Sequence, residues 1–426
     1  MRVGDGEDVK YHNTDKQGKD ASMSLSKIYL AGFLAYSGLC IPYFGHSFSF
    51  FGIHNRLLGL FVLIMAMLLG VRYFKLRRNA FNFFLLVAFF FLLLIIYSDY
   101  SQITQVFTFT FDQSQYYESK LSVALIVSIV PAIVGLVLSE IAINKEFRQG
   151  FVRAMLLWSL VAIIVGTQNS EYWFADYSKK AEWKNLVVFS QISMTILHLA
   201  GLVIFLVNIM NNKYIVFSVA LFVVSSFFVI VYQQRSAWIY VILVTIYLFY
   251  VVSGSDIIKI IKRAILLSVV LLLGFIVAIK IGVFTDSVIA YADQLIRGEV
   301  LSTRTPMYMI AWNGFLDNPL GNGFGAFSIS GSYARYPHNI LLEALYELGI
   351  FGGVVILILL YISSKTILQL LRLGKHDLDL LSIGLFFGYL LIVSLKSGDM
   401  AGLELLITMT LMFSNYQLRN KLELTH

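Results

Sequence analysis

The chain has 426 residues, of which 58% are hydrophobic and 13% charged, and its formal net charge is +7. Soluble domains contain about a quarter charged residues, so this composition excludes an ordinary soluble enzyme and indicates a polytopic membrane protein. Basic residues gather in the cytoplasmic loops of membrane proteins, so the positive charge does not indicate a nucleic-acid partner, and we predict none. The single cysteine, Cys40, excludes a disulfide framework and a cysteine-based metal site.

Twelve segments are apolar over about the 20 residues that an α-helix needs to cross a bilayer. The predicted fold class is therefore an all-α polytopic membrane protein with about 12 transmembrane helices. In chain order the segments are 28–44, 56–74, 80–97, 121–143, 150–167, 186–208, 213–231, 236–252, 263–281, 339–361, 378–395 and 400–416. Residues 1–27 and 417–426 are predicted to be terminal tails, the first of them disordered.

Three loops rich in Lys and Arg fix the predicted orientation. They join the second segment to the third, the eighth to the ninth and the tenth to the eleventh, so all three lie on the side of the N-terminal tail. An excess of Lys and Arg marks the cytoplasmic side, which predicts that both termini are cytoplasmic. The loops on the other side are then 98–120, 168–185 and 282–338, and the last of them, which is the largest, divides the chain into helices 1–9 (28–281) and helices 10–12 (339–416).

Local signals in the large loop predict two short helices. Thr285 can cap a segment that ends near Ile296 and has apolar residues at helical spacing. Thr305 can cap a second one, with Pro306 at its first helical position. This second helix is apolar nearly all round, so we expect it to pack on the membrane or on the bundle. No strand precedes the glycine-rich run 321–325, which favours turns over a nucleotide-binding loop.

Three arginines on the outer side could bind an anion. Arg235 lies at the outer end of the eighth segment, where it either snorkels to the lipid headgroups or grips a phosphate with its planar fork. Arg304 precedes a predicted helix start, a position that favours an anion. Arg335 lies three residues before His338. For both loop arginines the alternative is a solvated side chain.

His338 begins the tenth segment at the expected boundary of water and lipid. Imidazole is the natural general base near neutral pH, but a histidine here could instead cap the helix, as Asn339 equally could. Glu343 and Glu347 share one helix face at i, i+4 spacing, and carboxylates within membrane helices usually face the protein interior. One of them would orient His338 or bind a sugar hydroxyl; alternatively, both hydrogen-bond to neighbouring helices.

The spacing of these residues resembles that of a known family. The matching positions are Arg304, Trp312, Asn318, Pro319, Gly321, Gly323, His338, Asn339, Leu342, Glu343, Glu347, Gly349 and Gly352. Together they look like the motif block of the O-antigen polymerase/O-antigen ligase family of bacterial membrane glycosyltransferases. Arg235 is similar to an upstream arginine of that family, although it stands here in a Gln-Arg-Ser context where Ser-Arg-Gly is usual.

The resemblance implies a GT-C-like fold in the bacterial inner membrane, with the active site at the periplasmic surface. It implies a metal-independent, inverting glycosyltransferase without a cofactor, whose donor is a glycan on undecaprenyl diphosphate. Arg235 and Arg304 would bind the diphosphate, and His338 would activate the acceptor hydroxyl. The remaining substrate-binding candidates are Arg335, Glu343, Glu347, Asn339 and Trp312.

Within the family, we expect a polymerase that joins lipid-linked repeat units of O-antigen or a related surface polysaccharide. The alternative is a ligase that transfers the glycan to lipid A-core. Expected partners are the lipid-linked donor, a glycan or lipid A-core acceptor, membrane lipids and a chain-length regulator. A transporter or flippase of lipid-linked sugars is a different class, and it would place its polar site at mid-membrane.

Overall fold

The computed structural model describes most of the chain. The described residues are 9–44, 55–99, 102–103, 116–168, 191–211, 213–231, 235–253, 304–330, 336–397, 400 and 403–416, with single positions 258, 265, 269 and 276. Within these residues the protein is helical and contains no strand, which confirms the all-α class.

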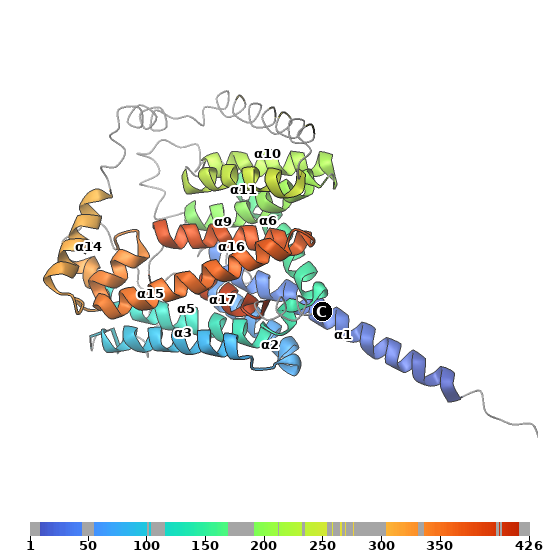
Figure 1. The fold of residues 1–426 in the computed structure, drawn as a ribbon, viewed down its shortest axis with the longest axis horizontal. Coiled ribbons are helices and arrows are strands. Elements are labelled where there is room, and N and C mark those ends of the chain that lie inside the picture. Colours follow the sequence, from blue (N-terminus) through green and yellow to red (C-terminus); the bar gives the residue numbers. More distant parts are fainter. Residues whose placement is uncertain are drawn as a thin grey trace, which may run out of the picture.

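Most of the helices lie side by side in one bundle, and α14 runs across one end of it (Figure 1). In chain order the α-helices are α1 (Val9–Cys40), α2 (Asn55–Gly70), α3 (Arg78–Ile96), α5 (Tyr116–Leu138), α6 (Lys145–Gln168), α9 (Gln191–Met210), α10 (Ile215–Val231), α11 (Arg235–Ser253), α14 (Thr305–Asp317), α15 (Ile340–Leu373), α16 (Leu378–Ser397) and α17 (Glu404–Phe413). Short 3-10 helices cover Ile41–Phe44 (η1), Val71–Tyr73 (η2), Ile141–Ile143 (η4) and Ala326–Ile329 (η6).

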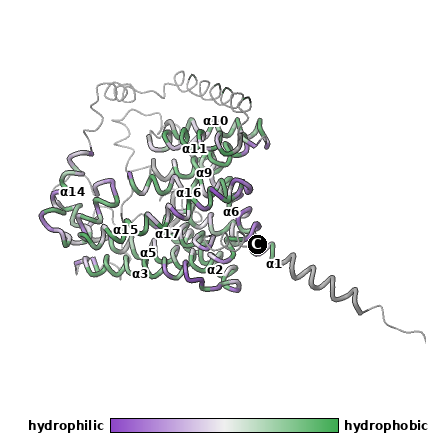
Figure 2. Tube along the Cα trace, viewed as in Figure 1, coloured by the Kyte–Doolittle hydropathy of each residue, from purple (hydrophilic) through white to green (hydrophobic). Residues whose placement is uncertain are grey.

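Four described helices are long and apolar enough to cross a membrane: Arg78–Ile96, Lys145–Thr167, Ile340–Leu373 and Leu378–Lys396. Shorter apolar helices coincide with the other predicted segments, except for the ninth, 263–281, most of which lies outside the described residues. Apolar residues dominate these helices, whereas hydrophilic ones gather at their ends and around α14 (Figure 2). The chain is thus a multi-pass membrane protein, while the count of twelve helices and the GT-C-like architecture stay predictions.

Two boundaries differ from the prediction. The N-terminal tail was expected to be disordered, but α1 begins at Val9, because no proline interrupts helical hydrogen bonding between Val9 and Cys40. The tenth segment was expected to end at residue 361, but α15 continues to Leu373. Polar turns at the start of α1 and at the end of α15 thus extend these helices beyond the apolar stretches that the sequence pattern detects.

Close approach of backbones joins α1 to the first turns of α6. A Cβ atom added at Gly32 would lie 2.1 Å from the carbonyl oxygen of Phe147, and one added at Gly150 would lie 2.1 Å from that of Tyr29. Small residues permit such crossings between membrane helices, where packing rather than hydrophobic burial drives association. These two glycines therefore fix where α1 and α6 cross.

The two ends of the bundle differ in their polar contacts. At one end, here called the basic end, Arg77 pairs with Glu140, and Arg148 pairs with Asp377. These contacts bring the loop 72–78 to the same end as the α15–α16 connection, as predicted from their basic residues. The other end, here called the site end, holds the last turn of α3, the first turns of α5 and α15, and α14. The basic loop predicted near residues 256–263 lies largely outside the described residues.

Candidate functional site

The site end is organised around a break in α15. Gly349 has φ 65° and ψ −155°, a conformation that side chains with a Cβ atom rarely adopt. A Cβ atom there would also lie 2.3 Å from the carbonyl carbon of Leu320. Because regular i to i−4 bonding fails across the break, the carbonyl groups just before it need donors from elsewhere in the chain.

The loop Asn318–Gly325 supplies those donors. Three backbone hydrogen bonds of 3.0 Å join the loop to the break: Asn322 N to Tyr346 O, Gly323 N to Glu347 O, and Ile350 N to Pro319 O. Positive φ values at Gly321, Gly323 and Gly325 bend the loop into this position. The prediction of turns for the glycine-rich run is therefore confirmed. The glycines allow the backbone conformation that makes these hydrogen bonds.

The same loop also binds α3 and the start of α5. The Phe324 amide donates to the Tyr97 carbonyl at 2.8 Å, and the buried Gln102 amide donates to the carbonyls of Phe324 (3.0 Å) and Tyr117 (2.8 Å). Burial raises the pKa of Tyr117 to about 12, and its hydrogen bond to Asp99 adds to the shift, so its hydroxyl remains a donor at neutral pH. The described parts of loops 98–120 and 282–338 therefore lie on one side, as predicted.

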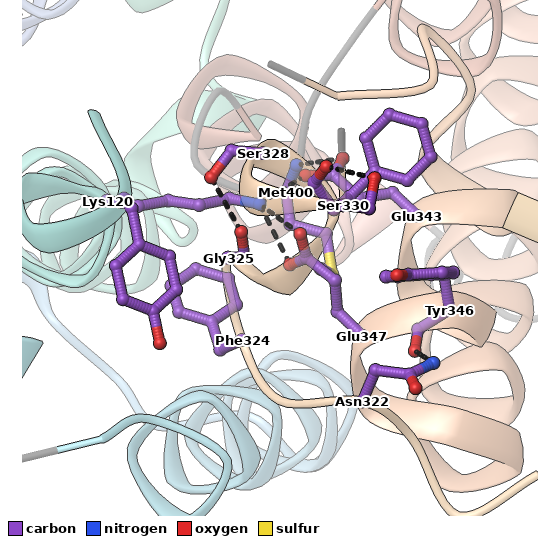
Figure 3. A network of polar contacts seen from close by, with 12 residues as sticks. Lys120, Asn322, Phe324, Gly325, Ser328, Ser330, Glu343, Tyr346, Glu347 and Met400 are labelled. Atoms are coloured by element: carbon purple, nitrogen blue, oxygen red, sulfur yellow. Dashed lines mark hydrogen bonds and ion pairs between the residues drawn. The ribbon is translucent and has the colours of Figure 1, made fainter. Parts of the chain in front are cut away.

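A buried ion cluster lies under the loop, formed by Lys120 of α5 and two glutamates of α15 (Figure 3). Lys120 Nζ donates to Glu343 Oε1 at 2.6 Å and to both carboxylate oxygens of Glu347 at 2.8 Å. All three side chains are 0% exposed. The Phe324 ring centroid lies 4.8 Å from Nζ, and Glu343 Oε2 accepts a 3.0 Å hydrogen bond from the amide of Met400.

The sequence predicted one half of this cluster. Glu343 and Glu347 share a helix face, as predicted from their i, i+4 spacing, and this lets both bind one ammonium group. Lys120 was missed, because a lysine at the start of an apolar segment usually snorkels to the surface. The signal that could have found it is the glutamate pair itself, since two carboxylates buried in a membrane helix need a cation.

The structure decides which of His338 and Asn339 caps α15. Asn339 is the N-cap of α15, and its side-chain oxygen accepts from the amides of Leu341 (3.0 Å) and Leu342 (3.1 Å). His338 is half-buried, with φ 56°, and its ring meets that of Tyr336 edge-on at 4.4 Å between centroids. A non-glycine residue with positive φ is uncommon and often occurs at functional sites. The helix cap is therefore Asn339.

Arg304 is anchored at the site end. It is the N-cap residue of α14, one position before the expected cap Thr305, and its Nη1 donates to the Lys396 carbonyl at 2.7 Å. Lys396 belongs to the last turn of α16, where unpaired carbonyls and the negative end of the helix dipole attract a cation. That bond uses one of the five N–H donors of a guanidinium group, which leaves its geometry compatible with a phosphate.

The structure describes the surroundings of the other site candidates only in part. Trp312 is 46% exposed on α14, and its ring centroid lies 5.7 Å from that of Phe315. Arg235 is the first residue of α11, but its side chain lies outside the described part, as does all of Arg335. The predicted helix near 285–296 also lies outside it.

Contacts connect Arg304 to the start of α15. Arg304 binds Lys396, Met400 follows four residues later, and its amide binds Glu343, one turn into the helix that Asn339 caps. Among the described residues, no three His, Cys, Asp or Glu side chains are grouped as metal ligands would be. The described contacts thus place a guanidinium and an imidazole on adjoining segments of one end.

The residues that a transporter would place along one passage have different surroundings in the described part of the chain. Glu343 is enclosed with Lys120, whereas His198 is buried in α9 with its ring stacked on Phe228 at 4.9 Å. Glu404 lines a different, apolar pocket, beside Pro42 and other residues of α1, α2 and α5. The described surroundings of these three side chains thus differ, which does not favour the transporter alternative.

Comparison with known protein families gives a match over part of the chain. A family model described as O-antigen ligase matches residues 219–357, about a third of the chain. The matched range includes Arg235, Arg304 and His338, and it ends just after the break at Gly349. The match supports the resemblance to O-antigen polymerases and ligases that the sequence motifs indicated. No curated protein matches the chain.

Proposed function

We propose that this protein is a membrane glycosyltransferase that moves a glycan from a polyprenyl diphosphate, such as undecaprenyl diphosphate, to an acceptor hydroxyl. The observation that carries the proposal is the placement of Arg304 and His338 on adjoining segments of one end, within the residues that the O-antigen ligase model matches. This end carries few of the basic loop residues, which favours the periplasmic side for the reaction. Both termini then face the cytoplasm.

In the proposed reaction, Arg304 and Arg235 neutralise the diphosphate, and His338 accepts the proton of the acceptor hydroxyl. The acceptor oxygen forms a bond to the anomeric carbon while the bond from that carbon to the phosphate oxygen breaks. The lipid diphosphate leaves with the electron pair. A single displacement of this kind inverts the anomeric configuration, and a diphosphate is a good enough leaving group that charge neutralisation and positioning supply most of the catalysis.

The exposed apolar face of α14 supports a lipid-borne substrate. Met309, Trp312 and Leu316 lie on one stripe of this helix and are 57%, 46% and 56% exposed. The stripe leads through Leu320, also exposed, towards Ile350 on the outer face of α15. A helix of this kind lies at the membrane interface, with tryptophan suited to the headgroup level. Arg304, at the start of α14, would then meet a diphosphate at the height of the headgroups.

We assign the acceptor first to a second lipid-linked glycan, which makes the enzyme a polymerase with a chain-length regulator as a further partner. The family description favours the alternative, a ligase with a lipid A-core acceptor. Purified protein incubated with lipid-linked repeat units alone separates the two. Chains longer than one repeat support the polymerase, whereas transfer only after addition of lipid A-core supports the ligase. Failure to release the glycan from its lipid diphosphate with either acceptor would contradict both.

A further inference from the structure

The ion cluster of Lys120, Glu343 and Glu347 has no part in the proposed chemistry, yet it occupies the centre of the site end. Its three side chains are 0% exposed, and the ammonium nitrogen makes three contacts of 2.6–2.8 Å to carboxylate oxygens. Burying such groups carries a large desolvation penalty, and removing one partner leaves uncompensated charge. A cluster of this kind therefore holds its parts in one arrangement.

Four separate segments meet at this cluster. Lys120 belongs to the first turns of α5, and the two glutamates belong to α15 before its break. Glu347 also accepts the Gly323 amide with its backbone carbonyl, and the Phe324 ring faces the ammonium group. The fourth segment is the connection from α16 to α17, whose Met400 amide binds Glu343. In Figure 3 these groups point towards one another from different elements.

The two proposed catalytic residues, His338 and Arg304, lie on or are bound to segments that contact the cluster. His338 comes directly before the cap of α15, five residues before Glu343. Arg304 is bound to Lys396 near the end of α16, four residues before Met400. A shift of α15 relative to α16 would therefore move the imidazole relative to the guanidinium. A misplacement of about 1 Å in a reacting site can lower the rate by about 100-fold.

We propose that Lys120 is a positioning residue, which sets the spacing of His338 and Arg304 by holding the broken helix α15 against the α16–α17 connection. This inference rests on the proposed function and assigns a role to a residue outside the family-matched range 219–357. Lys120 acts through Glu343 and Glu347, so those two carboxylates are structural partners of the lysine and do not bind sugar.

The test compares Lys120→Met with Arg148→Met, because each removes a buried cation from an ion contact and the second lies at the basic end. We expect Lys120→Met to lower kcat for glycan transfer by about 100-fold, with the KM of the lipid-linked donor changed less than about threefold. Lys120→Arg, which keeps the charge, should recover most of the rate. Arg148→Met should lower the melting temperature and leave kcat per folded molecule unchanged.

Hydrogen exchange supplies a readout that does not depend on activity. In Lys120→Met the amides of Asn322, Gly323 and Met400 should exchange at least about tenfold faster, since the segments they join are no longer held together. If Lys120→Met does not fold, Glu347→Gln keeps the Lys120–Glu343 contact and should show the same changes at smaller size.

Unchanged kcat in a folded Lys120→Met protein, or an equal loss of kcat in Arg148→Met, would overturn the positioning role. Unaltered exchange at the three amides would overturn it as well. Absence of transfer by the wild-type protein would instead remove the proposed function. Exchange alone would then decide whether Lys120 holds these segments, faster exchange supporting that role and unaltered exchange refuting it.

Discussion

The two ends of the bundle both bury a cation against carboxylates, but they differ in what the ion contact holds. At the basic end, Arg148 lies 2.6 Å from Asp377 with the side chains 9% and 25% exposed, and Asp377 also caps the regular helix α16. At the site end, Lys120 and its partners are fully buried beside a helix that is broken at Gly349. In this protein the regular start of α16 is satisfied by a cap, whereas the broken helix α15 is held by an inserted loop and a buried ion cluster.

The largest loss of folding stability at the site end is expected when Gly349 is given a side chain. Gly349→Ala should destabilise the fold by about 3 kcal/mol or more, because backbone strain adds to the clash with Leu320. Gly323→Ala is the matched control: its φ is also positive, but the nearest atom to an added Cβ atom is 3.6 Å away, so it should lose only about 1–2 kcal/mol. Melting temperatures of the two variants in detergent check the difference, and equal losses would contradict the role of the break.

Removing the imidazole should stop the chemistry without affecting the fold. His338→Ala should lower the rate of glycan transfer by about 10²–10⁴-fold, the usual contribution of a general base. Lipid-linked donor should still bind, which a fluorescent donor measures directly. Asp377→Asn at the basic end serves as the control and should transfer at the wild-type rate. Near-normal turnover in His338→Ala would remove the general-base role.

Loss of the cap of α15 should have a moderate effect. Asn339→Ala removes the acceptor for two backbone amides and should cost about 1 kcal/mol of stability, whereas Asn339→Ser should be close to wild type. Thermal unfolding measures both. A large loss of transfer in Asn339→Ser at unchanged stability would show that Asn339 binds substrate as well.

The smallest effect is expected from the ion pair at the basic end. Asp377→Asn keeps an oxygen that can cap α16 and removes the charge that faces Arg148. Because the carboxylate is 25% exposed and therefore screened by solvent, the loss should be about 1 kcal/mol or less. If Asp377→Asn lowered the free energy of unfolding as much as Lys120→Met does, the proposed difference between the two ends would be wrong.

The sequence predicted the membrane class, the positions of the apolar helices and the common side of the two outer loops, because these follow from hydrophobic patterns and turn residues. It also predicted α14 and the shared face of Glu343 and Glu347. It did not predict the break at Gly349 or the insertion of the loop Asn318–Gly325, because both depend on hydrogen bonds between distant segments. Lys120 was missed for the same reason, since its partners are more than 220 residues away.

The roles of individual residues follow less directly from the sequence than the fold does. A pattern alone could not decide between His338 and Asn339 as the cap of α15, because either side chain can accept from a helix amide. The structure decides it by distance, with Asn339 accepting from Leu341 and Leu342. For Arg304, the carbonyl of Lys396 is a partner from outside its own loop that no local motif indicates.

The most direct test of the account is a structure of the protein with a bound, non-reactive polyprenyl diphosphate glycan. We predict the diphosphate within hydrogen-bonding distance of the guanidinium groups of Arg304 and Arg235, with the imidazole of His338 on the acceptor side of the anomeric carbon. A diphosphate bound at the basic end, or at the site end with these three side chains directed away from it, would contradict the account.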